Sequence, residues 1–248
     1  MMIGKKLDWC LTGLISFFVV IVIGSSVQAQ IEKIELSIEE VTDQKTPYLN
    51  YPVSVIVQEE SGLVLISDWA NDRLVITDQN GKTQKIIPGL EGPVGMVYDS
   101  PTNRLYLTEQ KANRIRILDG STFAPISELK IQGITLNEPR GLWMDNGRNI
   151  YLVDTMNSRI VIFDQEGNLI RTIGKEGMGD DEFYYPRGIS VDSQGRIWMT
   201  DTLHHTVKVF DSVGNYLFRI GKGGSGPDDL DRPRYVIVKD ETVIISDY

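Results

Sequence analysis

The sequence predicts an all-β protein made of four-stranded antiparallel units repeated in tandem. A Pro-Arg-Gly segment at Pro139 returns 47 residues later at Pro186, and a related Pro-Arg-Tyr segment begins at Pro233. Between these copies, short β-branched and aromatic runs alternate with turn signals, without sustained helical periodicity. Because one such unit cannot bury its own apolar face, this period indicates units stacked side by side.

The first 29 residues are predicted to be a secretory signal peptide. Lys5 and Lys6 precede an apolar run at 11–24, and Val27-Gln28-Ala29 offers small residues where a signal peptidase cleaves. The apolar run is short for a membrane span. We therefore expect a secreted or periplasmic protein. Anchoring by an uncleaved N-terminal segment is the alternative, and this segment is the only membrane contact expected.

The composition argues against two classes of function. Cys10 is the single cysteine and lies inside the predicted signal peptide, so the rest of the chain has no thiol for a disulfide, a metal or nucleophilic catalysis. The chain has 248 residues and a formal net charge of −9. Such an acidic protein repels phosphate backbones, so nucleic acid is not an expected partner.

Residues 30–51 are expected to form an N-terminal strand, at 31–37, and a polar leader. The repeats then fill residues 52–248 as one domain, with units that start near 52, 93, 139, 186 and 233.

The unit that starts at Pro139 shows the predicted strands most clearly. Its four apolar or β-rich runs span residues 141–144, 149–153, 159–163 and 169–173. The third turn contains Gly167, at a point where a left-handed residue is usually needed. Tandem four-stranded meanders of about 40 to 47 residues are typical of the blades of a β-propeller.

The two best-preserved units also resemble a known repeat. The resemblance rests on Pro186, Gly188, Val191-Asp192, Gly195, Thr200-Asp201, Val207, Phe210 and Gly214, and on Val153-Asp154, Asn157, Arg159-Ile160 and Phe163. In these residues the chain resembles the NHL-repeat β-propeller family, from about residue 52 to 248, which implies a six-bladed ring. The sequence supplies four complete blades and half of a fifth. We therefore expect an incomplete six-bladed ring, from a fragment of a longer reading frame. A compact five-bladed ring completed by the N-terminal segment is the alternative.

Antiparallel order predicts which segments share a face of this ring. The starts of the inner strands, the turns after the second strands, and the long loops at 174–185 and 221–232 should open on one face. Long polar loops above a rigid scaffold often carry binding residues. We therefore expect the ligand site on this face, which we call the loop-rich face.

Arg140, Arg187 and Arg234 are the candidate ligand-binding residues. They occupy equivalent points of successive blades and should form an arc near the mouth of a central channel. Guanidinium groups suit a carboxylate or a phosphate, so the expected partner is an anionic small molecule, a glycan or a protein. The alternative is that each arginine pairs with an acidic residue of a neighbouring blade.

Recurring acidic residues have a structural interpretation. They end the second strands, where a carboxylate can accept backbone N–H bonds, and they are Asp68, Glu109, Asp154, Asp201 and Asp247. Arginines follow the first three by five residues, in position to pair across the hairpin: Arg73, Arg114 and Arg159. Thr206 replaces the arginine in the fourth unit.

His204 and His205 are the only histidines and the only metal candidates. Adjacent residues of a tight turn point in different directions, whereas zinc needs three or four converging ligands. No cofactor and no catalytic residue is therefore expected, and the chain has no G-x-S-x-G motif for a nucleophilic serine.

These observations favour an exported propeller that binds a ligand or a protein without catalysis. The resemblance also implies an alternative, because propeller lyases and lactonases of similar build hold a divalent cation with histidines at the channel mouth. Arginines occupy the corresponding strand starts here. A third hypothesis, a ubiquitin-ligase or RNA-binding NHL protein, conflicts with the export signal, the acidic charge and the absence of RING-type cysteines.

Overall fold

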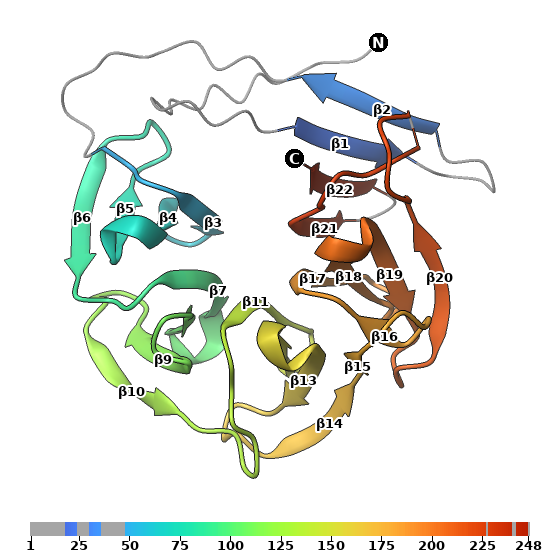
Figure 1. Cartoon of the computed structure of the whole chain (residues 1–248). Coiled ribbons are helices and arrows are strands. Elements are labelled where there is room, and N and C mark those ends of the chain that lie inside the picture. The colour runs from blue at the N-terminus through green and yellow to red at the C-terminus, as the bar shows by residue number, and fades with distance from the viewer. Residues whose placement is uncertain (1–17, 24–29, 36–47, 227, 240–241, 248) are drawn as a thin grey trace.

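Figure 1 shows the computed structural model, in which four-stranded sheets are arranged around a common centre. The structure describes residues 18–23, 30–35, 48–226, 228–239 and 242–247. Four sheets are each formed by contiguous chain, and a fifth has the strand order β2-β1-β22-β21. Strands pair antiparallel within all five sheets, which confirms the predicted all-β propeller with four-stranded blades.

The blades follow one another along the chain. The first contains β3 (Pro52–Gln58), β4 (Leu63–Asp68), β5 (Arg73–Thr77) and β6 (Thr83–Pro88). The second contains β7 (Pro93–Asp99), β8 (Arg104–Glu109), β9 (Arg114–Asp119) and β10 (Pro125–Leu129). The third contains β11 (Pro139–Met144), β12 (Ile150–Asp154), β13 (Arg159–Phe163) and β14 (Leu169–Ile173).

The fourth blade contains β17 (Pro186–Val191), β18 (Ile197–Asp201), β19 (Thr206–Phe210) and β20 (Tyr216–Ile220). Its loop from the third blade carries the short pair β15 (Lys175–Glu176) and β16 (Glu182–Phe183). One-turn 3₁₀ helices, one in each of the four blades, are η1 (Trp69–Asn71), η2 (Ser100–Thr102), η3 (Thr155–Asn157) and η4 (Thr202–His204).

The fifth sheet combines the two ends of the described chain. Its strands are β21 (Tyr235–Lys239), β22 (Thr242–Asp247), β1 (Phe18–Ile23) and β2 (Gln30–Glu35). Strand β1 pairs with β22, and β2 with β1. Strand β2 overlaps the N-terminal strand predicted at 31–37, and β1 falls within the predicted signal peptide.

Cleavage of the signal peptide stays a prediction, because its cleavage site lies outside the described residues, as does most of the polar leader. Within the ranges that the structure describes, no helix is long and apolar enough to cross a membrane.

Packing between blades builds the core. Tyr151 and Ile162 of the third blade share a buried cluster with Ile189 and Met199 of the fourth. Similar clusters join the second blade to the third, the first to the second, and the fourth to the fifth sheet. Each of the middle blades therefore packs against a neighbour on both faces, as the tandem repeat predicted.

The inner strand of the third blade begins two residues before its predicted start. Pro139 pairs with Asp154, and the register then shifts before the next pair, Leu142 with Leu152. The same shift follows Pro186 in the fourth blade. Each shift is a β-bulge that contains the Arg-Gly pair, and a bulge changes the direction of the side chains within it.

Candidate anion-binding site

The glycine of the Pro-Arg-Gly segment lets neighbouring blades approach each other closely near the centre of the ring. A Cβ atom on Gly141 would lie 2.5 Å from the carbonyl oxygen of Arg187, and one on Gly188 would lie 2.7 Å from that of Arg234. Any larger residue would push the next blade away. The glycine of one blade therefore sets the position of the arginine in the next.

Threonine hydroxyls of the second strands anchor the same backbone. The hydroxyl of Thr108 donates to the carbonyl oxygen of Arg140 at 2.8 Å and accepts from the N–H of Gly95 at 2.7 Å. Thr200 makes the equivalent bonds to Arg234, at 3.0 Å, and to Gly188, at 2.8 Å. Two of the three arginines are therefore tied through their main chain to the preceding blade.

The arginine side chains meet around Tyr185. The Nη2 of Arg140 donates to the Tyr185 hydroxyl at 3.1 Å. The guanidinium carbons of Arg140 and Arg187 lie 5.5 and 4.9 Å from the centre of the Tyr185 ring. Cations at such distances are attracted by the face of an aromatic ring. One tyrosine thus supports two guanidinium groups from different blades.

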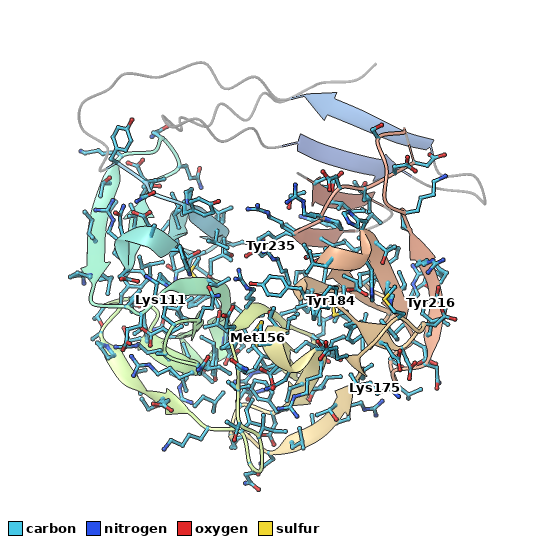
Figure 2. The ribbon with its side chains drawn as sticks, in the orientation of Figure 1. Lys111, Met156, Lys175, Tyr184, Tyr216 and Tyr235 are labelled. Carbon is cyan, nitrogen blue, oxygen red and sulfur yellow. The ribbon has the colours of Figure 1, made fainter. Side chains whose placement is uncertain are left out.

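The charges of Arg140, Arg187 and Arg234 all affect the pKa of Tyr235. Burial, together with the positive charges of Arg140 and Arg234, lowers the pKa of Arg187 below its ordinary value. Burial raises the pKa of Tyr235 to about 12, although the charges of the three arginines oppose this shift. Figure 2 shows Tyr235 at the centre of the ring. We call Arg140, Arg187 and Arg234 the arginine cluster.

Two donors of the arginine cluster have no acceptor among the residues that the structure describes. The Nε atoms of Arg140 and Arg187 are buried without a hydrogen-bond partner. The acid nearest to Arg140 is Glu138 of its own blade, with 3.7 Å between Nη2 and Oε2. Arg187 forms no ion pair with any described residue. Pairing with acids of neighbouring blades, the alternative from the sequence, is therefore not found for these two arginines.

The residues that precede the inner-strand prolines were not among the site residues predicted from the sequence. Tyr51, Glu138, Tyr185 and Arg232 have φ of 57°, 50°, 61° and 56°, and Gly92 has 63°. This left-handed backbone is unfavourable for residues other than glycine and is not the conformation that a following proline favours. Such strain often accompanies function. The sequence signal for this left-handed backbone was Gly92, which precedes Pro93 at the equivalent place in the second unit.

A chain of side-chain hydrogen bonds holds Tyr185 from the side. Trp69 donates to Gln110 at 2.8 Å, and Gln110 donates to Glu138 at 2.7 Å. The Tyr185 hydroxyl donates to the same Glu138 oxygen at 3.4 Å. These residues come from four successive blades. Residues from the three preceding blades therefore help to fix the position of the Tyr185 side chain.

The recurring acids have the structural role predicted for them. Buried carboxylates pair with the arginines five residues later in three blades: Asp68 with Arg73 at 2.6 Å, Glu109 with Arg114 at 2.5 Å and Asp154 with Arg159 at 2.8 Å. In the fourth blade, Lys208 replaces the missing arginine and lies 3.0 Å from Asp201. These acids stabilise hairpins and are not available to a ligand.

The two histidines do not meet. His204 contacts Asp201, with 2.7 Å between Nδ1 and Oδ2, where other blades have an asparagine such as Asn157. His205 accepts a hydrogen bond from the N–H of Arg232 at 3.2 Å. Among the described residues, no group of three potential metal ligands lies together.

The loop-rich face is confirmed. Met156 and Leu203, in η3 and η4, donate through their N–H groups to Asn137 and Tyr184, just before the inner strands. Lys208 donates to the Gly179 carbonyl oxygen in the long inter-blade loop at 2.9 Å. The turns, the long loops and the starts of the inner strands therefore lie together.

Comparisons with known proteins agree with this architecture. A family model described as a 6-bladed beta-propeller matches residues 136–197. Virginiamycin B lyase from Staphylococcus aureus, as a catalytically inactive variant with quinupristin, has a TM-score of 0.63 at 13% identity, over 97% of this chain and 80% of that one.

The chain is a β-propeller. The same propeller fold occurs in the nidogen/laminin complex, with a TM-score of 0.62 at 17% identity over 94% of this chain and 86% of that one. A protein of unknown function from Bacteroides caccae has a TM-score of 0.59 at 13% identity, over 89% and 78%. No curated protein matches the sequence of this propeller.

Proposed function

We propose that this propeller binds an anionic ligand at the centre of its loop-rich face through Arg140, Arg187 and Arg234. The observation that carries the proposal is the pair of buried Nε donors without acceptors in two neighbouring arginines. Buried donors in folded proteins are nearly always satisfied. An anion would satisfy them with charge-assisted hydrogen bonds, which are stronger than neutral ones.

Charge repulsion supports the same proposal. Burial, and after it the positive charges of Arg140 and Arg234, lowers the pKa of Arg187, so keeping these like charges together has a cost in free energy. A bound anion would offset that repulsion. A protein with a net charge of −9 that keeps three arginines together at its centre has concentrated positive charge locally.

The test is an Arg187→Ala substitution in the full chain. Isothermal titration calorimetry at low ionic strength would measure binding of acetate and of inorganic phosphate. We expect the wild-type protein to bind at least one of them, and the variant to bind roughly 10- to 100-fold more weakly.

The matched control is Arg171→Ala, because the side chain of Arg171 on β14 donates to the carbonyl oxygen of Ser212, at 3.3 Å, and lies outside the cluster. We expect wild-type affinity from it. Absence of binding to the wild-type protein, or equal losses in both variants, would contradict the proposal.

Binding without catalysis and export from the cytoplasm are part of the same proposal. The competing hypothesis from the NHL resemblance is a metal-dependent lyase or lactonase. Metal analysis of the purified protein distinguishes the two, since a stoichiometric divalent cation would favour the enzyme. N-terminal sequencing of protein recovered from the periplasm or the medium tests export, and we expect it to begin at Gln30.

A further inference from the structure

Large apolar side chains are exposed on the loop-rich face beside the arginine cluster. Met156 and Tyr184 expose 49% each, Leu203 exposes 38% and Met178 exposes 81%. A single exposed apolar side chain needs no explanation, but a group of them next to a charged cluster marks a candidate binding surface. We call Met156, Tyr184 and Leu203 the apolar rim.

The repeat places the apolar rim next to the arginines. Met156 and Leu203 occupy equivalent positions in η3 and η4, and each lies beside the segment that leads into its inner strand. Leu203 donates its N–H to the carbonyl oxygen of Tyr184 at 3.1 Å, and the residue after Tyr184 supports the guanidinium group of Arg187.

Figure 2 shows how the rim lies in the ring. Met156, Tyr184 and Tyr235 lie around the common centre, whereas Lys175 and Tyr216 lie towards the outside. Two residues of the rim, Met156 and Tyr184, therefore lie towards the centre of the ring.

At this turn position, large apolar side chains occur in the third and fourth blades. The residues equivalent to Met156 and Leu203 are Ala70 in the first blade and Lys111 in the second. The ammonium group of Lys111 lies 2.7 Å from Asp72. The rim therefore borders the arginines of the third and fourth blades, Arg140 and Arg187.

On the side of the cluster that the apolar rim borders, Arg140, Arg187 and Glu138 carry a formal net charge of +1, which matches a single negative charge on the ligand. Glu138 lies 3.7 Å from Arg140 and offsets part of its charge. Arg187 has no ion pair with any residue that the structure describes. One carboxylate would balance Arg187, whereas the second charge of a phosphate dianion would lie close to Glu138.

We infer that the ligand is a small-molecule monocarboxylate with an apolar body. This inference rests on the proposed function and specifies the class of anion. The carboxylate contacts Arg187 and Arg140, and an alkyl or aryl body covers Met156, Tyr184 and Leu203. Methionine adapts its shape to an apolar partner, and tyrosine offers a large apolar surface with a polar end.

A series of straight-chain carboxylates tests the inference. Acetate, butyrate, hexanoate and octanoate would be titrated into the full chain by calorimetry, with inorganic phosphate and neutral octanamide as comparisons. Each methylene group that becomes buried should raise the affinity about two- to fourfold. We expect octanoate to bind most tightly, and both phosphate and octanamide to bind more weakly than octanoate.

A double variant, Met156→Gln with Leu203→Gln, locates the apolar contact. The double variant should flatten the increase of affinity with chain length, because it replaces apolar surface by polar surface of similar size. The control is Val213→Gln, since Val213 is 58% exposed in the hairpin turn between β19 and β20. This control should keep the wild-type dependence on chain length.

The outcomes separate the inference from the function on which it rests. If acetate and octanoate bind with equal affinity and Arg187→Ala weakens the binding of both, the proposed anion site is supported. The inference that the ligand has an apolar body is then wrong. If the double variant keeps the wild-type dependence on chain length, the apolar contact lies elsewhere and the inference is overturned. If no anion binds, both the proposed function and the inference fail.

Discussion

Tyr185 reaches the arginine cluster because of an unfavourable backbone. Its φ of 61° directs the side chain towards Arg140 and Arg187 instead of continuing the extended strand. Its hydroxyl accepts from Arg140 and donates to Glu138, which determines the orientation of the ring. These hydrogen bonds offset part of the free-energy cost of the left-handed backbone.

Tyr235 should make stability depend on pH in the alkaline range. Its pKa in the folded protein is about 12, against an ordinary value of 10.0. Folding therefore favours the protonated phenol. This contribution to the free energy of unfolding is complete below about pH 10 and is lost as the pH rises towards about 12. Tyr235→Phe should lose less stability than the wild-type protein between about pH 9 and 11, as measured by urea denaturation.

Tyr151 provides an independent comparison, because burial and the nearby Asp145 raise its pKa to about 12 as well. Tyr151→Phe should reduce the alkaline dependence in the same direction. If Tyr235→Phe shows the full wild-type dependence on pH, the assignment to Tyr235 is wrong.

At the scale of the element, each blade ends its second strand on a buried acid. Asp154 accepts hydrogen bonds from the side chains of Arg159 and Asn157 and from the backbone N–H of Asn137, each at 2.8 Å. The carboxylate thus joins the third strand, the turn and the entry to the inner strand. A buried charge is tolerated here because every neighbour donates to it.

Asp154→Ala should destabilise the protein by about 3–5 kcal/mol, because it leaves Arg159 and a backbone donor without their acceptor. The matched control is Asp164→Ala. Asp164 lies in an exposed hairpin turn, where its carboxylate accepts the N–H groups of Glu166 and Asn168. We expect a clearly smaller loss of stability there, because the exposed turn can form hydrogen bonds with water instead. Urea denaturation measures both, and equal losses would contradict the structural role of Asp154.

The fourth blade keeps this role with different residues. Lys208 lies two residues after Thr206, and residues two apart on a strand share a face, so its ammonium group reaches Asp201. Arg116 of the second blade does the same beside Arg114, at 2.8 Å from Glu109. A cationic side chain therefore recurs on the same face of the third strand. Its position in the sequence can differ by two residues from one blade to another.

At the scale of the whole molecule, close contacts near the centre link the blades. Gly95 approaches the carbonyl oxygen of Arg140, as Gly141 approaches that of Arg187. A change in one inner strand should therefore displace the next blade and the arginine that it carries.

Gly141→Ala tests this link. Its Cβ would meet the Arg187 carbonyl oxygen at 2.5 Å, so we expect a loss of about 1–3 kcal/mol in stability and weaker anion binding. Gly147→Ala is the control, because its Cβ meets only side-chain atoms of Asp145 and Asn149, at 3.2 and 3.3 Å. Urea denaturation and calorimetry would measure both effects. Wild-type stability in Gly141→Ala would contradict the close packing.

The two ends of the series of blades expose apolar surface. Val55 and Val57 on β3 and Ile237 on β21 are exposed, whereas Met96, at the position of β7 equivalent to Val55, is buried. Inner strands elsewhere in the ring pack against a neighbour. Such exposed apolar surfaces are suited to contact with another apolar surface.

The sequence pattern predicted the third blade almost residue by residue. Strands at 159–163 and 169–173 lie where the alternation of apolar runs and turns placed them. The pairs of Arg73, Arg114 and Arg159 with acids followed from spacing alone, since residues flanking a tight hairpin turn must be neighbours. Local patterns of this kind depend on contacts between residues close in sequence.

The left-handed residues before the prolines could not be predicted from local preference, which opposes them. The same conformation recurs before the other inner-strand prolines, at Tyr51, Glu138 and Arg232, so it belongs to the packing of the blades and not to the preference of one residue. The replacement of Arg by Lys208 was missed for a related reason, since charge on a strand face can move by two residues without changing the pairing.

The repeat period by itself determined that this chain forms stacked four-stranded blades, and that Arg140, Arg187 and Arg234 start their inner strands. Those properties follow from hydrogen bonding and apolar burial within one unit. Only the tertiary structure decided that two of these arginines share one tyrosine and bury donors without acceptors. The distance between groups on different blades depends on how closely the blades pack around the centre, and no spacing along the chain encodes it.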